Sequence, residues 1–254
     1  MGFNIGAENR TRYNASIAAA QVWAETFWRT PGRPVALDLG AIGYWDPRRG
    51  IGVAGAADVA SWLDLVAGYD MAEATDKPVF ALAGGPQGIP SVGFTAGNSD
   101  HLSNADSVFD DFESFSMSAW IAPTTGVASG IIAKGDYEKA FCLTAGLNLR
   151  CYAQSAGGNM DHRTTAALTA DVMVHVAVSL TSPASGGSAF YIDGVAQAVT
   201  EVSSGSGALT VDATSDLFLG LAAGGYGSIV LGPVAYFDRP LSAAEVMALA
   251  NEQL

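Results

Sequence analysis

The end of the chain combines a strand pattern, a strand-breaking proline and a helix-start signal in direct succession. Residues 228–237 are largely apolar and rich in β-branched side chains, as is typical of a buried strand. Pro240 ends such a strand because proline has no N–H group to donate to a neighbouring strand. Ser242 and Glu245 have the spacing of a capping box, in which each side chain bonds the other residue's backbone N–H. A closing strand followed by a short C-terminal helix is therefore predicted.

Alternating side chains predict further strands in the middle of the chain. In residues 115–121 four alternate positions are apolar, and residues 172–178 carry valine at every second position. Such segments recur roughly every ten residues without a helical pattern between them, which favours an antiparallel sandwich.

The closing strand and the Asp-Arg-Pro-Leu-Ser-Ala-Ala-Glu-Val segment after it resemble the laminin-G-like jelly rolls of the concanavalin A-like lectin and glucanase superfamily. Four further segments agree in order and spacing: residues 115–121, 174–179 with the His-Val-Ala motif, 190–195 with Tyr-x-Asp-Gly, and 217–220. The resemblance covers about residues 90–254 and extends more loosely over residues 58–102. It implies an all-β, two-sheet antiparallel jelly-roll sandwich with a short C-terminal helix, and a structural role for His175.

Residues 1–36 do not match this pattern and are predicted to form a short N-terminal helical arm, with residues 37–254 as the sandwich. A helix over residues 17–29 would carry Trp23, Phe27 and Trp28. These aromatic side chains either pack on the sandwich or anchor the chain to a neighbouring protein. We favour the anchor, because exposed aromatic residues at a terminus are typical of interfaces. Residues 37–46 are expected to form the first strand and the loop after it.

Composition narrows the classes of partner. The chain has 254 residues, of which 49% are apolar and 15% charged, so one domain with a large core is expected. Its net charge of −13 argues against nucleic acid, whose phosphates require Lys and Arg. No apolar run reaches the roughly 20 residues of a membrane helix. Residues 1–8 lack the basic start and apolar segment of a secretory signal, so either a signal was removed or none is used, and Met1 favours the second.

The two cysteines, Cys142 and Cys151, flank a predicted hairpin. If Gly146 and Leu147 form a two-residue turn, Ala145 faces Asn148 and the two cysteines face each other within disulfide reach. The alternative is a pair of small buried thiols, and the sequence leaves both open.

No catalytic residues are predicted, and the protein is expected not to be an enzyme. The related glucanases carry Glu-x-Asp-x-x-Glu on a strand, which places carboxyl groups at the separation that hydrolysis needs. No such strand occurs here. The nearest acidic cluster, Asp110, Asp111 and Glu113, has the wrong spacing and is expected to be a solvated turn. The three histidines, at 101, 162 and 175, stand in no hydrolase or metalloprotease motif.

No cofactor is expected, calcium excepted. The resemblance implies that Ca²⁺ is often held at one rim by an Asp and backbone carbonyls, for which Asp100 and Asp136 are weak candidates. No Asp-x-Asp-x-Asp loop supports them. Glycan binding needs an aromatic platform beside polar groups. The aromatic residues not assigned to the core are Trp45, Tyr69, Tyr137, Tyr152 and Tyr226.

The expected function is that of a non-catalytic, lectin-like structural or adhesion protein of a bacteriophage virion, as a head decoration or tail component that binds host surface glycans. A protein whose relatives recognise extracellular glycans, but which has no export signal, must reach the exterior in another way, and release in a phage particle is one such way. Its partners would be other virion proteins, contacted through the arm in an oligomeric assembly. The alternatives are a secreted or surface-bound bacterial carbohydrate-binding module and a divergent glycoside hydrolase. The sequence leaves the ligand, copy number and particle position open.

Overall fold

The described part of the chain in this computed structural model consists of residues 34–54, 57–73, 75–82, 88, 90–105, 109, 111–124, 127–135, 138–181, 187–210, 212, 214–222 and 225–252. Nothing in this part is a helix long and apolar enough to cross a membrane. Trp23, Phe27 and Trp28 lie outside these residues, and so does most of the predicted arm.

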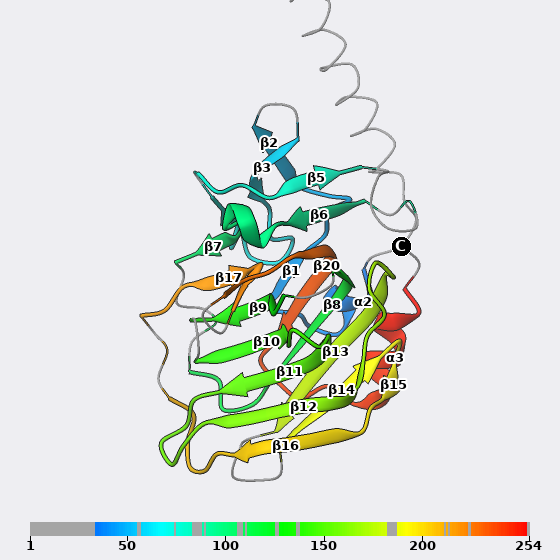
Figure 1. Ribbon diagram of the computed structural model, residues 1–254. Helices are drawn as coiled ribbons and strands as arrows, with labels where there is room; N and C mark the ends of the chain where they lie inside the picture. Colours follow the sequence, from blue (N-terminus) through cyan, green and yellow to red (C-terminus); the bar gives the residue numbers. More distant parts are fainter. Residues whose placement is uncertain are drawn as a thin grey trace, which may run out of the picture. The chain divides into compact units, whose positions relative to one another are not determined.

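The fold is an antiparallel β-sandwich of two layers (Figure 1). We call the first layer the back sheet. It contains, in spatial order, β5 (Val79–Ala81), β6 (Ser91–Phe94), β20 (Ile229–Phe237), β8 (Phe115–Pro123), β13 (Val174–Thr181), β14 (Gly187–Ile192) and β15 (Val195–Ala196), with β1 (Gly43–Trp45) also paired to β20.

The second layer is the front sheet. In spatial order it contains β3 (Asp58–Trp62), β4 (Met71–Ala72), β7 (Leu102–Asn104), β17 (Leu217–Leu219), β9 (Ser129–Lys134), β10 (Lys139–Leu143), β11 (Asn148–Ala153), β12 (Met160–Ala167) and β16 (Val199–Ser204). β2 (Ile51–Ala54) extends it beyond β3. The layers join where Asp58 of β3 pairs with Val79 of β5. A separate hairpin is formed by β18 (Leu221–Ala222) and β19 (Gly225–Tyr226), and η2 (Ala96–Asn98) is a short 3₁₀ helix.

The main core lies between the two layers and confirms the predicted alternation. Phe115, Met117, Ala119 and Ile121 of β8 all belong to it. Ser118, on the other face of this strand, is also buried, because two helices cover that side. The strand period of two therefore assigned the inward face correctly.

Two helices, α2 (Val35–Asp38) and α3 (Ala243–Ala250), pack with the outer face of the back sheet in a second apolar cluster. Val246 and Leu249 of α3 are buried there beside Ala36 and Phe237. The predicted first strand over residues 37–46 was wrong in its extent, since the helix α2 takes its beginning and β1 covers Gly43–Trp45 alone. The apolar residues of this segment, Leu37 and Leu39 among them, pack against the second cluster from the helix and the residue after it.

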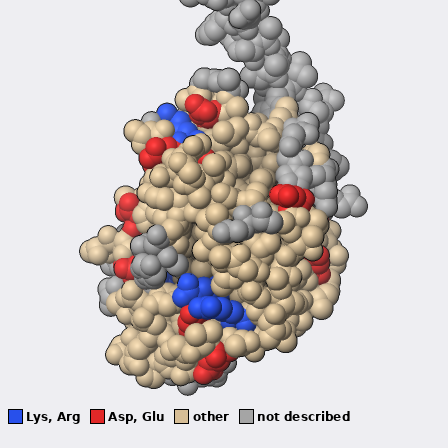
Figure 2. Space-filling view, in the orientation of Figure 1, with Lys and Arg blue, Asp and Glu red and all other residues tan. Residues whose placement is uncertain are grey.

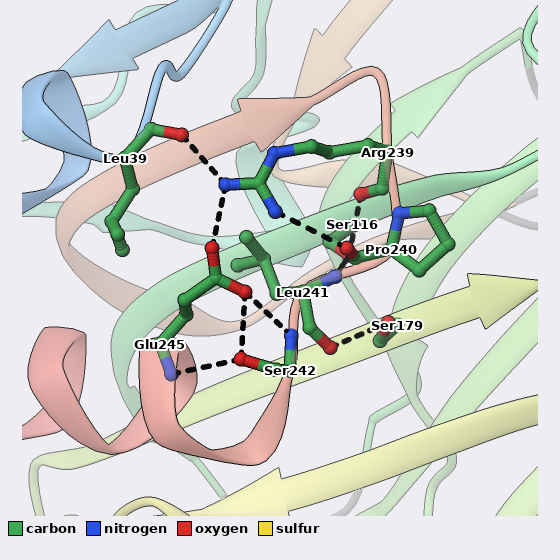
Figure 3. A network of polar contacts seen from close by, with 8 residues as sticks. All are labelled: Leu39, Ser116, Ser179, Arg239, Pro240, Leu241, Ser242 and Glu245. Atoms are coloured by element: carbon green, nitrogen blue, oxygen red, sulfur yellow. Dashed lines mark hydrogen bonds and ion pairs between the residues drawn. The ribbon is translucent and has the colours of Figure 1, made fainter.

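A polar network holds the segment after β20 to β8, β13 and α3 (Figure 3). Ser242 Oγ accepts a hydrogen bond from Glu245 N at 3.3 Å, and Ser242 N donates to Glu245 Oε2 at 2.8 Å, so the predicted capping box is confirmed. The Arg239 guanidinium donates to Glu245 Oε1 at 2.7 Å and to the Leu39 carbonyl at 2.8 Å. These bonds fix the turn that Pro240 creates.

The hairpin between β10 and β11 differs from its prediction by one residue in register. Its loop has three residues, 145–147, because Thr144 pairs with Asn148 and Leu147 adopts a left-handed φ of 62°. Leu147 gains burial in the main core in return. Cys142 therefore pairs with Arg150, and Cys151 pairs with Phe141. Because neighbouring residues on a strand face opposite sides, the two thiols lie on opposite faces, both free. Of the two alternatives that the sequence left open, the structure has the pair of buried thiols and not the disulfide.

Candidate functional site

The outer face of the front sheet, which points away from the main core, has an unusual floor of small residues. Ala133, Ala140 and Cys142 lie there, buried under Ala222 of the β18–β19 hairpin. The hairpin approaches so closely that a Cβ atom on Gly130 would lie 2.3 Å from the Leu221 carbonyl carbon. Small side chains on β9 and β10 are therefore required by the backbone that passes over them.

Beyond the hairpin, β11 and β12 place three charged side chains on this face: Arg150, Asp161 and Arg163, which we call the arginine cluster. Arg150 donates from Nε and Nη2 to the two carboxylate oxygens of Asp161 at 3.0 and 2.9 Å. Arg163 does the same at 3.0 and 2.6 Å. In Figure 2 a blue patch with red atoms beside it lies over these strands on an otherwise mostly tan surface.

Each oxygen of the Asp161 carboxylate accepts hydrogen bonds from both guanidiniums. Partial burial raises the pKa of this carboxyl, but hydrogen bonds from Arg163 and Arg150 outweigh that effect, so the pKa lies below its ordinary value. Asp161 therefore stays ionised and acts as the counter-charge of the two guanidiniums. It is not set up as a general acid, which would need a raised pKa.

Tyr152 supports the cluster from β11. Its ring lies 5.0 Å from the Arg150 guanidinium carbon, a cation–π contact, and it also packs against the small-residue floor. Since a guanidinium already lies over the ring, Tyr152 positions Arg150 and is not an open stacking platform.

A second group of rings comes from the β7, β17 and β19 side. His101 lies 6.1 Å from Phe218 and 5.6 Å from Tyr226, between ring centroids. Phe218 pairs with Ala133, which places it on the same outer face as Tyr152. The hairpin thus has aromatic rings on one side and the arginine cluster on the other.

Residues 96–247 match the family model described as the concanavalin A-like lectin/glucanases superfamily. The chain belongs to this superfamily. The resemblance predicted from five short segments is thereby confirmed, and so is the all-β jelly-roll fold. A comparison with curated proteins finds no match.

Several solved structures are similar to this chain in fold at low sequence identity. The ligand-binding domain of botulinum neurotoxin serotype D, in complex with N-acetylneuraminic acid, has a TM-score of 0.60 and 12% identity over 86% of this chain and 53% of that chain. The binding domain of Paraclostridial Mosquitocidal Protein 1 has a TM-score of 0.57 and 17% identity over 79% of this chain and 51% of that one.

A Trypanosoma rangeli sialidase aligns with a TM-score of 0.55 and 14% identity, over 84% of this chain and 32% of its own. The chain therefore spans about half of the mosquitocidal binding domain and about a third of the sialidase. Binding domains and a glycosidase both occur among the neighbours of this superfamily member.

The five predicted glycan-binding aromatics divide into three groups. Trp45 is fully buried, and its Nε1 donates to the Tyr69 carbonyl at 3.1 Å; Tyr69 itself packs edge-on against Phe109 in the core, so neither is a surface platform. Tyr152 and Tyr226 are brought to the outer face. Tyr137 lies outside the described residues.

Of the two calcium candidates, Asp100 alone lies in the described part of the chain. Asp100 is buried and its Oδ2 accepts a hydrogen bond from Thr95 N at 2.9 Å, a local turn contact. Asp136 is outside the described residues. Within those that are described, no three His, Cys, Asp or Glu side chains gather as metal ligands.

The acidic cluster that was expected to be a solvated turn makes specific contacts. The backbone N–H of Asp111 and that of Asp212 each donate to the other residue's carboxylate, and the Glu113 carboxylate accepts a hydrogen bond from Leu209 N.

His175 is the structural residue that the resemblance implied. It is 1% exposed, its Nε2 lies 2.8 Å from Ser118 Oγ, and no described residue bonds its Nδ1. Burial lowers the pKa of His175 to about 4. Among the described residues no carboxylate bonds this ring to orient it, as a catalytic histidine would need, and Trp120 packs edge-on against the ring.

Sequence reasoning missed the arginine cluster. Its signal was present as charged residues in two segments of the chain: Arg150 lies between the apolar Leu149 and Cys151, and Asp161 and Arg163 occupy alternate positions on either side of His162. Searching for aromatic residues alone passed over it.

Proposed function

We propose that this protein binds glycans, without cleaving them, on the outer face of the front sheet. The observation that carries the proposal is the arginine cluster, three polar side chains of fixed geometry beside aromatic rings on a sheet face of small residues. Sugar sites combine such apolar surface with a few well-placed polar groups. The superfamily and the sugar in the neurotoxin neighbour's structure support the same proposal.

Polar groups on the adjacent edge strand enlarge the surface. Thr200 of β16 pairs with Arg163, and Ser203 pairs with Asp161, so both hydroxyl residues share the outer face with the cluster. Both are exposed. Hydroxyl and guanidinium groups together supply the donors and acceptors that sugar hydroxyls match.

The non-catalytic part of the proposal rests on the state of Asp161. It is the carboxylate at the centre of this face, and two arginines hold it ionised. Retaining and inverting hydrolysis both need one carboxyl that is protonated at working pH. A virion location, with the arm as attachment, stays a prediction.

A blocking variant tests the proposal directly. Thr200→Trp places a bulky side chain beside Arg163 without removing any member of the cluster, and should abolish binding on a glycan array that contains neutral and acidic glycans. Val195→Trp is the matched control, since Val195 is 58% exposed on β15 of the back sheet. Wild-type protein that binds no glycan, or binding equally insensitive to both variants, would overturn the proposal.

A further inference from the structure

The arginine cluster carries an uncompensated positive charge on a strongly acidic protein. Two guanidiniums share one carboxylate, while the whole chain has a net charge of −13. Resting on the proposed function, we propose that the glycan recognised here bears a carboxylate, which Arg150 and Arg163 bind through N–H groups that Asp161 leaves free.

The hydrogen-bond pattern identifies these free groups. Both arginines bond Asp161 through Nε and Nη2, and no described residue accepts a hydrogen bond from Nη1 of either one. A guanidinium has five N–H donors, so each side chain keeps a second edge for a ligand. The Arg163 side chain is 36% exposed and that of Arg150 is 21% exposed, so both can be reached from solvent.

The second arginine brings a like charge beside the first, which separates the cluster from a simple structural ion pair. Arg150 and Arg163 are direct cross-strand partners. Like charges in this position destabilise a sheet. One arginine and one aspartate would give a neutral pair, so the second guanidinium is explained by a ligand better than by stability.

Charge also limits the kind of acid. A planar fork matches a carboxylate in two parallel hydrogen bonds. A long polyanion would be repelled by the remaining acidic surface. The cluster therefore suits one acidic sugar unit at a time, in a glycan that is short or mostly neutral.

The test compares acids with their own neutral esters. Trigalacturonate and 3′-sialyllactose are titrated into the protein by calorimetry or NMR, each beside its methyl ester, with lactose 6′-sulfate as a sulfated arm. We expect at least one carboxylate to bind about tenfold or more tightly than its ester. Equal binding of both acids and their esters, or a preference for the sulfate alone, would overturn the carboxylate assignment.

Variants assign the effect to the cluster. Arg163→Gln should remove the difference in affinity between each acid and its ester. Arg163→Lys keeps the positive charge but cannot donate two parallel hydrogen bonds, so it should restore part of that difference. Asp161→Asn should increase affinity for the acid, because it removes the competing carboxylate; a purely structural network would instead lose binding. Arg49→Gln, which removes a positive charge on the β1–β2 turn, should change nothing. Acid preference that survives Arg163→Gln would contradict the proposal.

Failure of this inference is distinguishable from failure of the proposed function. If neutral glycans bind and Thr200→Trp abolishes that binding while acids gain no advantage, the face binds sugars but the carboxylate assignment is wrong. If no glycan of either class binds, the proposed function itself is wrong.

Discussion

Arg150 and Arg163 lie directly opposite each other on β11 and β12, and the Asp161 carboxylate bridges them. The three side chains form one electrostatic unit, in which the aspartate separates two like charges. The aspartate has two partners and each arginine shares only the one aspartate, so substitution of Asp161 and substitution of one arginine should lower the stability of the fold by different amounts.

Asp161→Ala should therefore destabilise the fold more than Arg163→Ala, by about 1 kcal/mol. Loss of Asp161 leaves two guanidiniums facing each other, whereas loss of Arg163 leaves a neutral Arg150–Asp161 pair. Urea unfolding of both variants measures the difference. The reverse order would show that the arginines do not repel each other appreciably.

The capping box should make stability depend on acid pH. The Arg239 side chain, followed by the backbone and hydroxyl of Ser242, lowers the pKa of Glu245 to about 2. Because the folded-state pKa of Glu245 is depressed, its contribution to the free energy of unfolding is fully present above the unfolded-state pKa of about 4.3. This contribution is lost as the pH falls toward 2. Glu245→Gln should lower stability at pH 7 by about 1 kcal/mol and flatten the melting temperature between pH 4.5 and 2.

The side chains of Arg239 and Glu245 are partly exposed, so solvent screening keeps the ionic part of their interaction small. High salt should reduce the difference between wild type and Glu245→Gln. A variant as stable as wild type at pH 7 would show that the network in Figure 3 does not hold the C-terminal helix.

Protonation of His175 should cause a second loss of stability on acidification, in a higher pH range than that of Glu245. Burial lowers its folded-state pKa to about 4 from an ordinary 6.5, so the folded state resists protonation. The contribution of the neutral His175 to the free energy of unfolding is complete above pH 6.5. About 3 kcal/mol of it is lost as the pH falls toward 4. His175→Gln should be less stable at pH 7, because Ser118 Oγ loses its partner, but should show a flatter profile between pH 6.5 and 4. A profile unchanged by the substitution would place the titration elsewhere.

Gly130 and Gly225 offer a matched pair beside the candidate site. Gly130→Ala should cost about 1–3 kcal/mol, because its Cβ would lie within 2.3–2.7 Å of the β18 backbone and push the hairpin off the small-residue floor. Gly225→Ala, in β19 of the same hairpin, meets no heavy atom within 4 Å and should be nearly neutral. Thermal melts of both variants check this. Equal stabilities would mean that the hairpin does not lie tightly on β9.

The cysteines should behave as two buried, unreactive thiols. Burial raises the pKa of Cys142 to about 12 and that of Cys151 still further above its ordinary range. Thiol titration should therefore be slow in the native protein and count two thiols after denaturation. A reducing agent should leave the melting temperature unchanged. A non-reduced mass two hydrogens lighter than the reduced protein would contradict the register of this hairpin.

Local signals in the sequence were enough for several strands and for the closing helix cap, though not for the first strand or the β10–β11 loop. The period of two in residues 115–121, the Asp193–Gly194 turn and the Ser242–Glu245 cap each depend on neighbours within a few residues, and each is found in the structure. Five such segments in order also gave the superfamily. Their physical causes are short-range: strand pleat, left-handed φ and backbone capping.

The candidate site depended on tertiary structure, because its members meet across strands. A three-residue loop at 145–147, stabilised by burial of Leu147, set the β10–β11 register and sent Cys142 and Cys151 to opposite faces. Pairing of β11 with β12 then brought Arg150 and Arg163 together around Asp161. The sequence determined which residues alternate on each strand, but loop conformation and core packing decided which strands became neighbours, in which register, and therefore which charges face each other.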